Sequence, residues 1–179
     1  MRRLTMIAGA LCVALVTSTG AFAQVPPDPN NPNEAIPDAL NVVPYGETIK
    51  LADAMKAADA ALAEVTKRKW NGAFCVSVVG PSGDLVYFVK GDNCQYASIE
   101  ISQHKARVAA RYRRPTVVFE RLLGKGPNFA YLTTLDGMTG SRGGNPIVVG
   151  GKMIGAIGVS GGSGSQDDAI SLAGQAALK

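Results

Sequence analysis

GGNPIVVGGKMIGAIGVSGGSGSQDD, residues 143–168, holds two runs of β-branched residues around the pair Gly150–Gly151. Strand-forming runs joined by two glycines predict a β-hairpin. Gly155 and Gly158 fall within the second predicted strand. A strand residue without a side chain leaves room for a helix or a second backbone, so we expect close packing against this strand.

The glycines that follow this strand predict a sharp turn into a terminal helix. Gly161, Gly162 and Gly164 lead to Ser165, which has capping-box spacing to Asp168, with Asp in place of Glu. Free backbone N–H groups at such a helix N-terminus can hold a carboxylate or a similar anion. Two interpretations therefore stay open: a small anion bound beside Gly161, or a helix capped by its own side chains.

Upstream, the chain changes between helix and strand patterns. AFCVSVVG and LVYFVKG flank PSGD, residues 81–84, and this order predicts a second hairpin. Before that hairpin, residues 47–70 predict a long helix with one apolar face. The apolar side chains of that face recur at three- and four-residue spacing: Leu51, Ala54, Met55, Ala58, Ala61, Leu62 and Val65.

Further helices are predicted between the two hairpins. Residues 98–112 have helical spacing, with Ser98 as the expected N-cap. Pro115 separates this helix from a short third one over residues 116–123, which a glycine follows. YLTTLDGMTG, residues 131–140, predicts another strand. Because strands adjacent in the chain form hairpins, we expect a single α+β domain, an antiparallel sheet flanked by helices.

The first segment of the chain predicts a secretory signal peptide over residues 1–23. Arg2 and Arg3 precede an apolar run that ends in Ala21-Phe22-Ala23, a small-residue cleavage site. We therefore expect a periplasmic or secreted protein with no stable membrane span after cleavage. Loss of the two arginines would lower the formal charge from +4 by 2, which disfavours nucleic acid as a partner.

The mature chain divides into an arm and a domain. Residues 24–45 are rich in proline and asparagine, which is typical of an extended arm, and residues 46–179 form the predicted domain. Cys75 and Cys94 lie in the domain. The hairpin places Cys75 opposite a residue near Lys90, and a disulfide needs Cα atoms within about 7 Å. The pairing of the two cysteines therefore stays open, and two cysteines with one histidine do not make a zinc site.

The stretch GVSGG, residues 158–162, matches the G-x-S-x-G turn of α/β-hydrolases. In that class an acid and then a histidine follow the serine in the chain. His104 is the only histidine and precedes Ser160. No G-x-x-x-x-G-K-[ST] phosphate loop occurs either. The pattern therefore disfavours a serine nucleophile and a phosphate loop, and the glycines are explained by packing.

The second predicted helix carries most of the candidate binding residues. His104 is either a surface histidine or an axial ligand of heme iron. Lys105, Arg107 and the later arginines form a basic stretch, which is either a solvated face or a site for carboxylates. Glu100 lies one turn before His104 and is a candidate acid or base.

Two stretches together resemble the GlcG/HbpS heme-binding family. SIEISQHKARVAARYRRPT, residues 98–116, is similar to its helix pattern, and residues 143–168 are similar to its glycine-rich signature. Val108 departs from the pattern, which has threonine or serine there. The resemblance implies a profilin-like α+β fold, homo-oligomers and, in some members, heme or related tetrapyrroles. It assigns no role to His104. The matching residues are Lys105, Ala106, Gly143, Gly144, Pro146, Gly158, Ser160 and Gly161.

Three functions follow as hypotheses. The first is an exported protein that binds heme or a tetrapyrrole with no catalysis or only weak catalysis, with His104 as the iron ligand and Lys105, Arg107, Ser160 and Gly161 around it. The second is an enzyme acting on a small carboxylated or aromatic metabolite. Its acid or base would be Glu100 or Asp168, with Lys105 or Arg107 holding the substrate and Ser160 hydrogen-bonded to it. The third is an oligomeric scaffold without a ligand.

Overall fold

The computed structural model describes residues 43–179, so the predicted signal peptide and most of the predicted arm lie outside the described residues. Within this part the chain forms one α+β domain, as predicted. The elements follow in this order: α1 (Leu51–Lys67), β1 (Cys75–Val79), β2 (Leu85–Lys90), α2 (Tyr96–Arg111), α3 (Thr116–Leu123), the 3-10 helix η2 (Pro127–Thr134), β3 (Gly144–Val149), β4 (Lys152–Ser160) and α4 (Gly164–Ala176).

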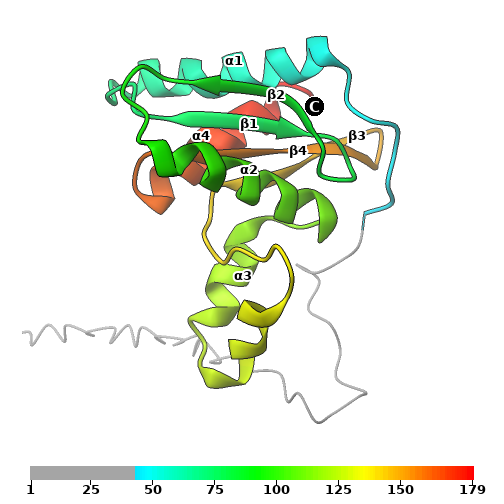
Figure 1. Ribbon diagram of the computed structural model, residues 1–179. Helices are drawn as coiled ribbons and strands as arrows, with labels where there is room; N and C mark the ends of the chain where they lie inside the picture. Colours follow the sequence, from blue (N-terminus) through cyan, green and yellow to red (C-terminus); the bar gives the residue numbers. More distant parts are fainter. Residues whose placement is uncertain (1–42) are drawn as a thin grey trace, which may run out of the picture.

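The four strands form one antiparallel sheet in the order β2-β1-β4-β3. Both predicted hairpins are present, and their strands meet across β1 and β4, where Ser77 lies opposite Gly158. Helices α1 and α4 pack on one face and α2 covers the other, while α3 and η2 project away from the sheet (Figure 1). The sheet therefore separates two cores, and α2 alone covers one of them.

Helix α1 is shorter than the predicted segment, and its apolar face is rotated. Ala54, Ala58 and Ala61 are buried as expected, and Ala57 is buried as well. Leu51 and Met55 were expected in the core but are 55% and 41% exposed. The reason is that α1 packs on both the sheet and α4, so its buried stripe is made of small side chains that allow close approach.

Three local predictions were wrong. Residues 131–140 form no strand: the first of them complete η2, whose tight turns leave no extended backbone to pair with the sheet. Ser98 is not the N-cap of α2, which begins after Gln95. The capping box of α4 is formed by Ser163 and Gln166 rather than by Ser165 and Asp168, because the N-cap lies two residues earlier than predicted.

Cys75 and Cys94 form a disulfide, with their Cα atoms 5.9 Å apart. As the hairpin predicted, Cys75 lies opposite Lys90 in the β1–β2 ladder. The turn after β2 brings the chain back, so that Cys94 reaches Cys75 from the segment just before α2. The disulfide thus joins the first residue of β1 to the segment that leads into α2.

The last residues of the predicted arm belong to the folded domain. Tyr45 pairs in parallel with Met153, and Met153 N donates to Pro44 O at 2.9 Å. These residues lie beside the first part of β4, beyond the point where β1 ends at Val79. None of the helices in residues 43–179 combines the length and the apolar character that crossing a bilayer requires.

Candidate functional site

Helix α2 has two faces with different roles. Its inner face is built from small and polar side chains, among them Ser98, Ser102 and Ala106, which lie against β1 and β4. At Gly158 of β4, an added Cβ would overlap the carbonyl oxygen of Ser102 and lie 2.5 Å from Ala106 N. The close packing that the sequence predicted at Gly158 is therefore present, and glycine is needed there for steric reasons.

Lys105 belongs to the inner face of α2, although a lysine is usually exposed. Its side chain is 2% exposed, and its ammonium donates to Asp167 Oδ2 at 2.7 Å and to Val159 O at 3.1 Å. Burial raises the pKa of the Asp167 carboxyl above its ordinary value, against the opposing effect of the Lys105 ammonium. The pair joins α2, β4 and α4, and leaves Lys105 unavailable to a substrate or cofactor.

Asp167 also fills the glycine turn where an external anion was considered. Its Oδ1 accepts a hydrogen bond from Gly162 N at 3.0 Å, while Ser163 and Gln166 cap the helix. Gly161 has a positive φ of 148°, and an added Cβ there would overlap the carbonyl oxygen of Ala73. The helix is therefore capped by its own side chains, and Gly161 serves packing rather than a ligand.

Ser160 and Asp168 are committed to the fold as well. Ser160 is buried, and its hydroxyl donates to Ser98 Oγ at 3.0 Å. Asp168 Oδ1 accepts a hydrogen bond from the buried Asn145 at 3.1 Å. Every buried side-chain nitrogen or oxygen in residues 43–179 has a hydrogen-bond partner. No orphaned polar group marks a reacting centre at Ser160.

The proposed acid–base cluster is not assembled. Glu100 is exposed on α2, whereas Lys105 and Ser160 are buried beneath the same helix. Five residues along an α-helix turn the side chain to a different face, so Glu100 and Lys105 point in different directions. The geometry gives the enzyme hypothesis no paired acid and base among these residues.

The outer face of α2 carries a hollow of about 210 Å³ beside His104. We call it the His104 hollow, and it is lined by His104, Arg107, Val108, Arg111, Tyr112, Asp136 and Gly137. The imidazole is exposed, so its nitrogens are open to a ligand. Tyr112 packs edge-on against Phe119 at 5.3 Å between ring centroids, and Val108 joins the same cluster. An apolar wall backed by α3 and η2 therefore faces an exposed imidazole.

Two guanidinium groups flank this wall, and both are partly held. Arg107 Nη2 donates to Gln103 Oε1 at 3.0 Å, and Arg111 Nε donates to Ser82 O at 2.9 Å in the β1–β2 turn. Each guanidinium has further N–H groups that can bind a carboxylate. The hollow thus combines an imidazole, two cations and an apolar wall, with Asp136 as its one carboxylate.

Sequence reasoning placed three residues of this hollow, His104, Arg107 and Arg111, among the candidate binding residues, and did not place Val108 or Asp136 beside them. Arg111 and Tyr112 lie at i+7 and i+8 from His104, a helical spacing that brings them to the same side of α2. Asp136 carried no usable signal, because its segment was expected to be a strand. Among residues 43–179 no three His, Cys, Asp or Glu side chains cluster as they would around a metal ion.

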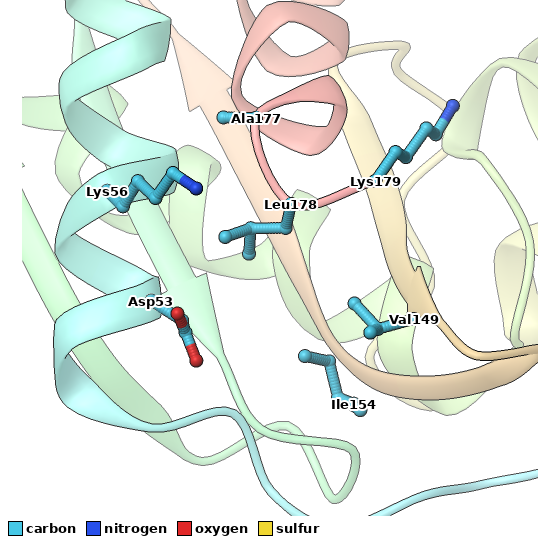
Figure 2. A pocket seen from close by; sticks show the side chains of 7 residues that line it. All are labelled: Asp53, Lys56, Val149, Ile154, Ala177, Leu178 and Lys179. Carbon is cyan, nitrogen blue, oxygen red and sulfur yellow. The ribbon is translucent and has the colours of Figure 1, made fainter.

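A second hollow of about 210 Å³ lies between α1, the β3–β4 hairpin and the end of α4 (Figure 2). Asp53 and Lys56 border it on α1, and Ile154 and Leu178 form part of its apolar floor. This hollow lacks histidine and aromatic side chains. It therefore offers neither an iron ligand nor a stacking surface.

The chain resembles known proteins over most of the described domain. Residues 49–176 match the family model described as "Haem degrading protein HbpS-like". Protein GlcG of Escherichia coli strain K12 is 35% identical over 110 residues, which are 62% of this chain and 81% of GlcG. The crystal structure of HbpS superposes with a TM-score of 0.67 at 29% identity, covering 75% of this chain and 92% of HbpS.

A structure with bound heme shares the fold. The crystal structure of a PduOC–heme complex superposes with a TM-score of 0.66 at 22% identity, covering 74% of this chain and 96% of PduOC. At this identity the likeness concerns the fold alone.

Proposed function

The chain belongs to the HbpS-like family, and from this premise we propose that it is an exported protein that binds heme or a related tetrapyrrole at the His104 hollow. The observation that carries the proposal is the exposed imidazole of His104 beside an apolar wall and two guanidinium groups. The relationship to a family described by haem degradation, and the fold shared with a heme complex, point to the same ligand class. Export rests on the signal-peptide pattern of residues 1–23.

The residues of the hollow suit the chemistry of this ligand class. The His104 imidazole is a type of axial ligand that holds heme iron in many proteins. Arg107 and Arg111 can form charge-assisted hydrogen bonds to propionate carboxylates, while Val108 and Tyr112 offer apolar contact to the ring. When bound, heme would supply a redox-active iron.

The size of the hollow bears on the assembly. Pockets that enclose a small-molecule ligand usually measure about 300–1,000 Å³, and the His104 hollow measures about 210 Å³. One protomer would therefore cover only part of a tetrapyrrole. A second copy of the chain would cover the remaining part of the tetrapyrrole, in keeping with the homo-oligomers that the family resemblance implies. Measuring the mass of the protein in solution, with and without ligand, tests this assembly.

Loss of the imidazole tests iron ligation directly. We expect the His104→Ala variant to bind hemin on the order of tenfold more weakly and to shift the Soret band, because the axial ligand is removed. Its affinity for iron-free protoporphyrin IX should stay close to that of the wild type. The matched control is Lys56→Ala, in the second hollow, which should leave both affinities unchanged. Wild-type protein without a hemin-dependent Soret shift would contradict the proposed function.

Loss of a guanidinium tests carboxylate recognition separately. Arg107→Gln should weaken the binding of both hemin and protoporphyrin IX by about 10- to 150-fold, since one charge-assisted hydrogen bond contributes about 1.5–3 kcal/mol. Both ligands carry the same propionates, so the two losses should be equal. Arg121→Gln, an exposed arginine on α3, is the control. Equal affinities for Arg107→Gln and wild type would remove Arg107 from the site.

A further inference from the structure

The C-terminal end of α2 contributes Val108, Arg111 and Tyr112 to the His104 hollow. This end is held by backbone hydrogen bonds and by a side chain from a distant segment. Three carbonyls near this end accept backbone N–H groups: Tyr112 N donates to Val108 O at 3.0 Å, Arg113 N to Ala110 O at 3.2 Å, and Arg114 N to Ala109 O at 3.2 Å. The carbonyl of Arg111 instead accepts the phenol of Tyr45 at 3.0 Å. A side chain 66 residues away in the sequence thus completes the end of the helix.

Tyr45 is fixed by the sheet on its other side. Gly46 N donates to Met153 O at 2.8 Å, and Met153 N donates to Pro44 O at 2.9 Å. The backbone around Tyr45 is therefore part of the sheet beside β4, while its hydroxyl lies at the end of α2. Tyr45 therefore links β4, through its backbone, to the C-terminal end of α2, through its hydroxyl.

Arg113 strengthens this link at a conformational cost. It follows the last turn of α2 with a φ of 54°, in the left-handed region where glycine is the usual residue after a helix. Its guanidinium lies 4.7 Å from the centroid of the Tyr45 ring, and Nη1 donates to Val43 O at 3.4 Å. The chain therefore keeps an arginine where glycine would adopt the same backbone conformation at a lower cost.

We propose that Tyr45 and Arg113 are positioning residues for the ligand site. By tying segment 43–46 to the end of α2, they fix the last two turns of the helix, from which Arg107 and Arg111 reach the hollow. Arg111 is also tied to Ser82 in the β1–β2 turn, so the helix end is held from two sides. The role in ligand binding rests on the proposed function, whereas the role in ordering α2 does not.

The test compares Arg113→Gly and Tyr45→Phe with wild type by amide hydrogen exchange and by hemin titration. Arg113→Gly relieves the left-handed backbone, so the melting temperature should not fall. We expect both variants to exchange residues 108–112 several-fold faster and to bind hemin several-fold more weakly. Tyr131→Phe, which alters a tyrosine that is 55% exposed on η2, is the matched control and should behave as wild type in both measurements.

The outcomes separate the two proposals. Wild-type exchange rates in both variants would overturn the positioning role, and so would faster exchange with unchanged hemin affinity. If wild-type protein fails to bind hemin, the proposed function falls, and the exchange rates alone decide whether Tyr45 and Arg113 order the end of α2.

Discussion

Lys105→Met is expected to destabilise the protein by about 3–5 kcal/mol, a large effect for a single substitution. The reason is that Lys105 and Asp167 are 2% and 3% exposed, so removal of the ammonium leaves a buried carboxylate without its counter-charge. The Gly162 N–H bond to Asp167 offsets only part of this cost. Urea denaturation followed by circular dichroism measures the change in free energy of unfolding.

The double variant Lys105→Met with Asp167→Leu should recover most of the loss, because replacing both members of a buried pair with apolar side chains is often close to neutral. Lys67→Met, which breaks a surface pair with Glu64, is the control and should leave unfolding unchanged within error. A loss for Lys105→Met no larger than that for Lys67→Met would show that the buried pair does not hold α2 to the sheet.

Gly158→Ala should destabilise the protein by about 3 kcal/mol through overpacking. The added Cβ would overlap the carbonyl oxygen of Ser102 and crowd Ala106 N, and both are backbone atoms that can move only if α2 moves. In open space, a Gly→Ala substitution in a strand is favourable, so the clash decides the sign. Thermal unfolding by calorimetry measures the effect.

Gly72→Ala provides the control, because no atom lies within 4 Å of the added Cβ and its φ is not in the left-handed region. It should be neutral or slightly stabilising. If Gly158→Ala is as stable as Gly72→Ala, the close approach of α2 to β4 is not a constraint, and the steric explanation for this glycine fails.

The sheet could be predicted from the sequence because its signals are local. The two hairpins depend on β-branched runs around PSGD and Gly150–Gly151, and both are present. The positions of Gly155 and Gly158 could be interpreted because an isolated glycine in a strand signals close packing. For residues 131–140 the threonines led to a wrong prediction of a strand. Residues 131–134 instead complete the 3-10 helix η2, which packs on α3.

The inner face of α2 was harder to predict, because it combines polar residues from distant segments. Lys105 was assigned to a ligand since lysines are usually exposed, and only the fold brings Asp167 to it. Asp168 was named and Asp167 was not, because the N-cap of the helix was placed at Ser165, two residues late. In the structure Asp167 accepts a hydrogen bond from Lys105 and Asp168 accepts one from Asn145, so neither aspartate belongs to the capping box.

The outer face of α2 was predicted in part. His104 and Arg107 fall on one side of the helix by spacing alone, and the structure places both in one hollow. The contributions of Asp136 and Tyr45 come from loops or segments that are far away in the sequence. Only the folded chain brings them to α2.

Helix α2 has an inner face that holds the fold and an outer face that we propose binds the ligand. Chemical-shift mapping with gallium protoporphyrin IX, a diamagnetic stand-in for heme, tests this division most directly in ¹H–¹⁵N spectra of the protein. We expect shifts at His104, Arg107, Val108 and Arg111, with the signals of Ser160 and Gly161 unchanged. Shifts centred on Ser160 and Gly161, or no shifts on α2, would contradict this division.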